Sequence, residues 1–119
     1  MSEQTVPTIK KINVLEKAET EGVFVPKSVG KVGDVTLEIA VGKGELPFWH
    51  TNDEDEFVYC VRGSIHYQLK FDDKELDQVD VNAGELFTIP AGVAHKPACS
   101  DDNVVLIMEK VNPWTTFDD

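Results

Sequence analysis

Turn-forming residues interrupt this 119-residue chain at intervals of about ten residues, and short apolar runs fill the spaces between them. In several runs apolar and polar residues alternate, a period of two that predicts strands with one buried face. The predicted strands cover residues 23–25, 35–41, 57–61, 65–71, 79–81, 86–89 and 104–111. Many short strands joined by tight turns are typical of an antiparallel sandwich or a closed barrel, so we expect an all-β fold.

Helical signals are sparse along the chain. Residues 14–20 are the best candidate for a helix, but the segment is short and has no clear apolar stripe. A chain of this length fits one domain with a single core. We expect one domain over residues 1–119, with a barrel core at about 33–111, an N-terminal arm at about 1–32 and a peripheral tail at 114–119.

The charge composition argues against two classes of partner. The chain has 22 acidic and 11 basic residues, a net charge of −11. Such a surface repels phosphate backbones and anionic lipids, so we expect neither nucleic acid nor a membrane as a partner. The sequence has no apolar leader, and Cys60 and Cys99 show no disulfide or zinc spacing. We expect a cytoplasmic protein with two free thiols.

Two segments carry side chains that can bind a metal. His50, Asn52 and Glu56 are separated by even numbers of residues, so strand geometry can point them into one barrel interior. His95 follows the turn Pro90-Ala91-Gly92 in the second segment. Two imidazoles and one carboxylate that leave coordination positions open are the ligand set that suits Fe(II). Mn, Ni, Co and Zn are the alternative metals. We expect one divalent transition metal, held by His50, Glu56 and His95.

The same two segments resemble the two motifs of the cupin superfamily. The matching positions are Gly44, His50, Asn52, Glu56 and Gly63 in the first motif, and Gly84, Pro90, Gly92, His95 and Cys99 in the second. The resemblance implies a double-stranded β-helix, the jelly-roll β-barrel of that family. Two departures stand out, because Asn52 occupies the place of a second histidine ligand in many cupins and Cys99 replaces the closing asparagine.

Both departures leave a choice of role. An amide is a poor ligand compared with imidazole, so for Asn52 a hydrogen bond to bound water or substrate is favoured over weak coordination. Cys99 is expected to be a buried, inert thiol, with ligation through its thiolate as the alternative.

The pattern His-x-Asn-x3-Glu, followed by His95-Lys96-Pro97, is similar to the 3-hydroxyanthranilate dioxygenase branch, which holds Fe(II) through two histidines and a glutamate. The resemblance places Glu109 near that branch's active-site glutamate, while a solvated strand residue without a role is the alternative for this position. In an enzyme, Asn52 or Glu109 would handle protons. The arginines that bind the substrate carboxylate in that branch are replaced by Leu46 and Cys99. The resemblance therefore disfavours 3-hydroxyanthranilate, and we expect a neutral substrate.

Strand alternation extends the predicted site beyond the motifs. If Glu56 faces inward, every second residue after it does so too. The expected pocket residues are Phe48, Val58, Cys60, Arg62 and Cys99. The expected outward row is Phe57, Tyr59 and Val61. Because an apolar row of that size is usually covered, we expect a homodimer.

These features favour a non-haem Fe(II) dioxygenase that acts on a small phenolic or enediol substrate. Two other functions stay open. One is a metal-dependent module that binds or senses a small molecule without turnover. The other is an isomerase or lyase that uses Zn, Ni or Mn as a Lewis acid.

Overall fold

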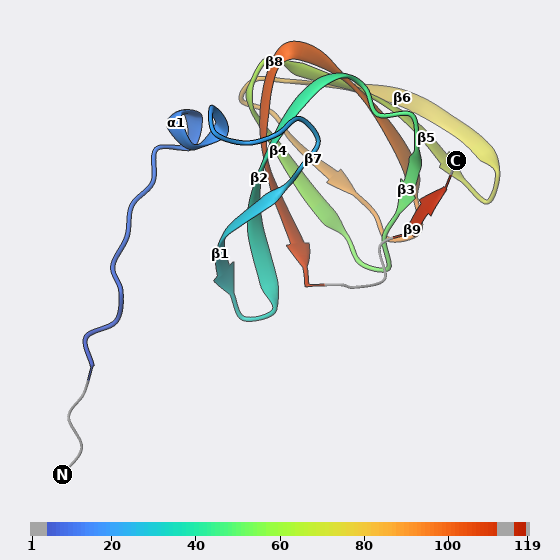
Figure 1. The fold of residues 1–119 in the computed structure, drawn as a ribbon. Coiled ribbons are helices and arrows are strands. Elements are labelled where there is room, and N and C mark those ends of the chain that lie inside the picture. The colour runs from blue at the N-terminus through green and yellow to red at the C-terminus, as the bar shows by residue number, and fades with distance from the viewer. Residues whose placement is uncertain (1–4, 112–115, 119) are drawn as a thin grey trace.

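The computed structural model describes residues 5–111 and 116–118, and its elements are almost all strands (Figure 1). The elements are α1 (Val14–Ala18), β1 (Lys27–Val32), β2 (Val35–Glu45), β3 (Trp49–Thr51), β4 (Glu56–Arg62), β5 (Ser64–Phe71), β6 (Lys74–Asn82), β7 (Leu86–Ile89), β8 (Ala94–Lys110) and β9 (Thr116–Asp118). The predicted all-β fold is confirmed. In the described residues, no helix is long and apolar enough to cross a membrane.

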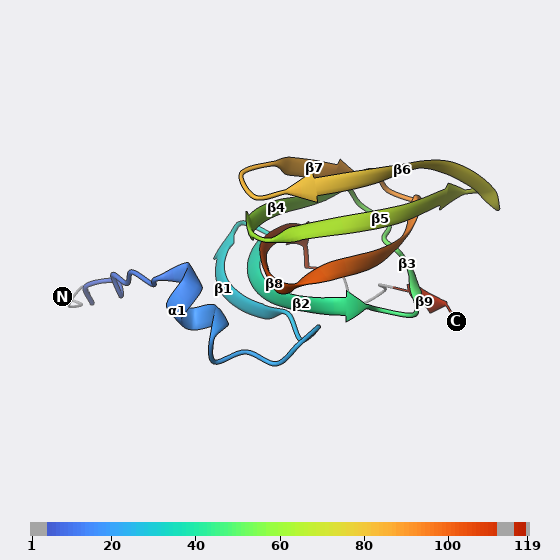
Figure 2. The ribbon, with the colours of Figure 1, turned by 90° about the horizontal axis from the view of Figure 1, so that it is seen from above.

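Strand β8 joins the two layers of the barrel. Its first half pairs with β5, and its second half pairs with β4, while β2 pairs with both halves. All of these ladders are antiparallel. Seen from above, β2 and β6 lie on opposite sides of the molecule with β5 and β8 between them (Figure 2). A single long strand thus holds the barrel walls around one interior.

The inward and outward phase of β4 follows the alternation expected from the sequence. Val58 and Cys60 are fully buried in the main core, whereas Phe57 and Tyr59 are 41% and 37% exposed. Arg62 breaks the pattern, because the pairing of β4 with β8 shifts register between Cys60 and Arg62 and leaves the arginine exposed. The prediction that Arg62 faces inward is therefore wrong.

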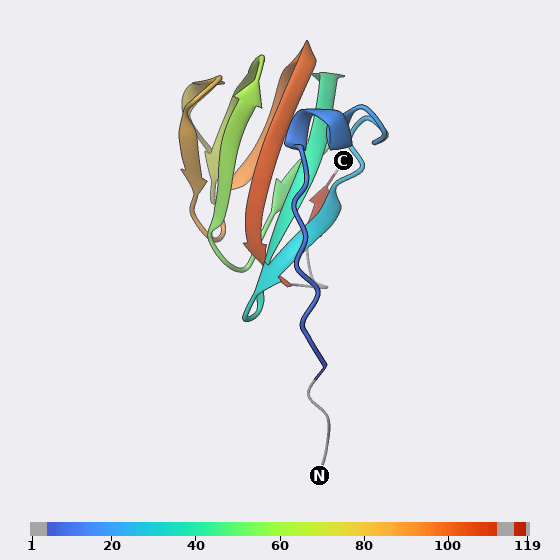
Figure 3. The ribbon, with the colours of Figure 1, turned by 90° about the vertical axis from the view of Figure 1, so that its left-hand side faces the viewer.

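The N-terminal region contains more structure than the predicted arm. The short helix lies where the sequence favours one, begins at the cap residue Asn13 and buries Ala18 against Ile39 and Val104. Residues 27–32 form β1, which pairs with β2, so the expected boundary at residue 33 falls inside a hairpin. From α1 back to residue 5 the chain runs away from the barrel (Figure 3).

Two predicted segments at the ends of the chain differ from their expected form. Residues 23–25 make a single bridge, Val23 to Val41, and not a strand. In the tail, residues 116–118 form β9, which pairs with β3. The rest of the tail lies outside the described residues.

Candidate functional site

A cavity of about 310 Å³ opens inside the barrel. Much of its wall is apolar, with contributions from Phe24, Leu46, Phe48, Ile65 and Ile107. Its polar side chains are His50, Asn52, Glu56, Tyr67, His95, Asn103 and Glu109. No lysine or arginine of the described chain lines it. The cavity is an apolar pocket with one polar wall, as small-molecule sites commonly are.

The three predicted metal ligands converge on this polar wall. His50 and His95 are direct cross-strand partners on β3 and β8, and their ring centroids lie 5.7 Å apart at an interplanar angle of 76°. Glu56 begins β4, and its Oε2 lies 3.6 Å from His95 Nε2. His95 Nδ1 lies 3.1 Å from the Val93 carbonyl oxygen, the usual acceptor for an imidazole N–H. That bond leaves Nε2 as the nitrogen with a free lone pair.

Burial sets the charge of these groups. It lowers the pKa of His95 to about 4 and also lowers the pKa of His50. Burial raises the pKa of Glu56 to about 7. Among the described residues, the only ion-pair partner of Glu56 is His95, which is neutral at neutral pH. A buried carboxyl group therefore lacks a compensating positive charge, which a divalent cation would supply.

The donor chemistry fits a divalent transition metal, since neutral imidazole nitrogens and a carboxylate oxygen are its usual ligands. As they stand, however, the described residues form no group of three or more His, Cys, Asp or Glu side chains arranged to hold a metal ion. The carboxylate of Glu56 instead accepts a 2.6 Å hydrogen bond from Nδ2 of the buried Asn52. Metal binding by His50, Glu56 and His95 stays a prediction.

Asn52 was expected to bond to water or substrate, and here it contacts Glu56. Its amide donates to Oε2, so it can fix the orientation of that carboxylate. The hydrogen bond from the Asn52 amide lowers the pKa of Glu56 and so partly offsets the rise that burial causes. Asn52 thus lines the polar wall itself and is bonded there to Glu56.

Glu109 on β8 lines the pocket, and the side chain of a second glutamate, Glu38 on β2, is bonded to it. Its pKa is raised to about 8, by burial first and then by a hydrogen bond to the Glu38 side chain and the charges of Glu56 and Glu38. Sequence reasoning missed Glu38, which lies on the same inward face of β2 as Ala40 and Gly42. Alternation in residues 35–41 was the signal that could have identified it.

The predicted pocket residues separate into three groups. Phe48 and Cys99 line the cavity, and burial raises the pKa of the Cys99 thiol to about 11. Val58 and Cys60 face inward but belong to the packed core and not to the pocket wall. Arg62 Nε donates to the Asp102 carbonyl oxygen at 2.9 Å.

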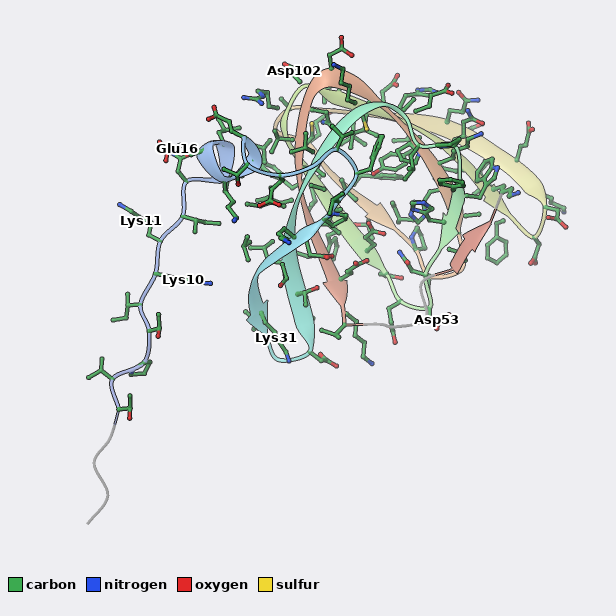
Figure 4. The ribbon with its side chains drawn as sticks, viewed as in Figure 1. Lys10, Lys11, Glu16, Lys31, Asp53 and Asp102 are labelled. Atoms are coloured by element: carbon green, nitrogen blue, oxygen red, sulfur yellow. The ribbon has the colours of Figure 1, made fainter. Side chains whose placement is uncertain are left out.

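Asp102 and Asp53 lie at opposite ends of the barrel (Figure 4). Because Arg62 bonds to the first and Asp53 follows Asn52, the arginine lies at the opposite end of the barrel from Asn52. The pocket residues that sequence reasoning missed include Phe24, Pro26, Tyr67 and Asn103.

A model of the cupin domain matches residues 35–109, more than half of the chain. Among curated proteins, the chain is similar to 3-hydroxyanthranilate 3,4-dioxygenases. The Candida albicans protein is 26% identical over 106 residues, which cover 86% of this chain and 61% of that protein. The Yarrowia lipolytica protein is 30% identical over 82 residues, which cover 68% of this chain and 47% of that protein. The chain thus spans about half the length of these relatives.

Solved structures share the fold. A hydroquinone 1,2-dioxygenase in complex with Cd²⁺ and 4-hydroxybenzonitrile matches with a TM-score of 0.76 at 21% identity, over 95% of this chain and 84% of that one. A cupin-2 domain protein of Shewanella frigidimarina matches with a TM-score of 0.70 at 28% identity, over 83% of this chain and 93% of that one. The expected jelly-roll β-barrel is confirmed.

Proposed function

Since this chain belongs to the cupin family, we propose that it is a single cupin domain acting as a metal-dependent dioxygenase on a small phenolic or enediol substrate. The observation that carries the proposal is the polar wall of the pocket. There, two imidazoles kept neutral by burial lie beside a buried carboxyl group that has no compensating charge among the described residues. The similarity to 3-hydroxyanthranilate and hydroquinone dioxygenases supports the same reaction class.

The proposed ligands are His50, Glu56 and His95, and the proposed metal is Fe(II), with Mn, Ni, Co and Zn as ions of compatible ligand chemistry. A bound Fe(II) would supply Lewis acidity toward substrate oxygens and the redox chemistry that activates O2. Asn52 holds Glu56 in orientation through its hydrogen bond to Oε2. Once deprotonated, the Glu56 carboxylate would supply the negative charge that such a cation requires.

Glu109 is the proposed proton carrier. It lines the pocket, and its raised pKa of about 8 keeps a proton on its carboxyl group at neutral pH. A carboxyl group whose pKa lies near the working pH can both give and take a proton. The apolar wall, including Phe48 and Leu46, excludes water from the substrate.

Reconstitution with Fe(II) under anaerobic conditions tests the proposal. Nitric oxide added to the loaded protein should give a ferrous nitrosyl signal in electron paramagnetic resonance, and hydroquinone or catechol should perturb it. Admission of O2 should then consume one equivalent of O2 per substrate and yield a ring-cleaved product of matching mass. A perturbed signal without O2 consumption would instead support a binding module. The His95→Ala variant is the negative control.

We also propose that the chain forms a homodimer through the outer face of β4 and β7. On that face Phe57, Tyr59 and Leu86 are 41%, 37% and 58% exposed, and Tyr59 and Leu86 are cross-strand partners. The three side chains are uncharged, so two copies of a strongly acidic chain can bring these positions together without direct charge repulsion between them. Analytical ultracentrifugation should show a dimer for the wild type and a monomer for Leu86→Lys. A monomeric wild type would contradict this proposal.

A further inference from the structure

The segment that links α1 to β1 adds two side chains to the pocket. It crosses β2 before the chain turns back to form β1 (Figure 1). The Phe24 N–H donates to the Val41 carbonyl oxygen at 2.8 Å, and Val23 bridges to Val41 in parallel. These contacts fix the segment to β2. From it, Phe24 and Pro26 reach the pocket wall.

The backbone at Phe24 has an unusual conformation. Its φ is +58°, in the left-handed region that glycine adopts freely and a bulky side chain adopts only at a cost. The conformation turns the Phe24 side chain toward the pocket, while its neighbours Val23 and Val25 stay 46% and 51% exposed. Strain of this kind clusters at sites where a side chain has a function that the strain makes possible.

The pocket has apolar groups on its wall that can receive an aromatic ring. Phe24, Pro26 and Phe48 all line it. Aromatic rings interact with one another favourably in edge-to-face or offset arrangements. No lysine or arginine of the described chain lines the cavity, so a ligand held by these apolar groups would find no cationic partner there.

We propose that Phe24, together with Phe48 and Pro26, forms a ring-binding subsite that selects a single neutral aromatic ring and is held in place by a strained backbone. The inference rests on the proposed function, because it concerns the substrate of the same pocket. It goes further because it assigns a role to the segment that links α1 to β1. That segment would make the pocket select an aromatic ring over an aliphatic enediol or diol.

The test compares stability with ligand affinity in the full-length, Fe(II)-loaded protein under anaerobic conditions. Phe24→Gly removes both the ring and the strain, and because the lost burial and the relieved strain oppose each other, its thermal midpoint should change little. Its affinity for hydroquinone should fall by about tenfold, the amount expected for loss of a ring contact and its buried area. Phe24→Leu keeps an apolar side chain, so it should weaken hydroquinone while leaving the weak binding of cyclohexane-1,2-diol unchanged.

A matched control exists in the turn between β5 and β6. Asp73 has φ +63°, and the pocket residues do not include it. Asp73→Gly should therefore relieve backbone strain, though less than at Phe24 because aspartate tolerates the left-handed region, and should leave hydroquinone affinity at the wild-type value. This comparison separates the effect of backbone relief from the effect of losing the ring.

Three outcomes would overturn the subsite. The first is that Phe24→Gly binds hydroquinone as tightly as the wild type does. The second is that this variant loses stability and affinity in parallel. The third is that the wild type does not bind hydroquinone. The proposed dioxygenase activity can fail separately. If hydroquinone binds, Phe24→Gly weakens it as expected and the wild type consumes no O2, the subsite stands and the proposed reaction does not.

Discussion

Glu56 is the residue whose surroundings most restrict the chemistry of the pocket. The residue is 7% exposed, and its carboxyl group is bonded to Asn52 and close to a histidine that cannot supply positive charge at neutral pH. An isolated carboxylate is costly to bury, and burial raises its pKa to about 7. A divalent cation would reverse this effect, because its charge favours the ionised form.

Alanine substitutions should separate the ligands from their supporting residue. His50→Ala, Glu56→Ala and His95→Ala should each lower Fe(II) affinity by about a hundredfold or more, because a site of three ligands loses a donor. Asn52→Ala should lower it by about tenfold or less, since Asn52 acts through Glu56. Competition with a metal-sensitive dye measures all four affinities. Equal losses across the four variants would show that Asn52 is itself a ligand.

Glu109 should make the stability of the metal-free protein depend on pH. Its pKa is about 8 in the folded chain against an ordinary value of 4.5, so between these values the folded state holds a proton that the unfolded state lacks. Stability should therefore fall as pH rises from about 6.5 to 8. Glu56, with its pKa raised to about 7, also makes stability fall with rising pH up to about pH 7. His95, with its pKa lowered to about 4, makes stability rise with pH, but only below pH 6.5.

The variant Glu109→Gln removes this titration without changing the shape of the side chain. Urea unfolding between pH 6.5 and 8 should give a flatter profile for this variant than for the wild type. Glu75→Gln, at an exposed position on β6, is the matched control and should keep the wild-type slope. An unchanged slope in Glu109→Gln would show that Glu109 is ionised throughout this range.

Motif spacing predicted which side chains converge, and local backbone geometry decided the rest. His50, Glu56 and His95 all line the pocket, as even spacing and the second motif indicated. Phe24 could not be predicted, because a left-handed turn and not strand alternation directs its ring. Alternation predicts an inward Arg62 only if the strand register is unbroken. The register shift between Cys60 and Arg62 breaks it, so the arginine is exposed.

At the scale of elements, the close approach of β2 to β8 depends on a glycine. A Cβ built at Gly42 would lie 2.4 Å from Cys99 Sγ and 2.8 Å from Asn103 Oδ1. Both atoms belong to buried or half-buried side chains on β8, and Asn103 is also held by a bond from its Nδ2 to the Arg62 carbonyl oxygen. The two strands can approach this closely only where one of them lacks a side chain.

Gly42→Ala should therefore destabilise the barrel by about 1–3 kcal/mol, the usual cost of overpacking. Gly30→Ala on β1 is the control, because a Cβ there meets nothing within 4 Å, and it should change stability by less than about 0.5 kcal/mol. Adding Cys99→Ala to Gly42→Ala should recover part of the loss, since the closest contact is removed. Urea unfolding measures these differences, and equal stability of the two glycine variants would contradict the prediction.

The strands themselves were largely predictable, but their extent and partners were not. The sequence predicted the strand at residues 104–111, whereas β8 continues from Ala94 through two turn-like residues, Asp101 and Asp102. Its first half contains His95 and its second half Glu109, so one element carries both a predicted ligand and the proposed proton carrier. Local composition could not show this, because the continuity of β8 depends on pairing with β2, β4 and β5.

At the scale of the whole molecule, charge and pocket composition act in the same direction on substrate choice. The chain carries a net charge of −11, and no lysine or arginine of its described residues lines the pocket. Burying a carboxylate without a partner costs several kcal/mol, on the order of a thousandfold in affinity. Catechol should therefore bind the metal-loaded protein far more tightly than 2,3-dihydroxybenzoate, as measured by anaerobic calorimetry at pH 7.

Two variants make this prediction specific to the pocket. Leu46 lines the cavity, so Leu46→Arg should place a guanidinium beside the ligand and narrow or reverse the preference for catechol. Arg62 bonds to the Asp102 carbonyl oxygen away from the pocket, so Arg62→Ala should leave the preference unchanged. Tighter binding of 2,3-dihydroxybenzoate by the wild type would contradict the neutral-substrate prediction. If Arg62→Ala then abolished that binding, the arginine would have to reach the ligand in the bound state.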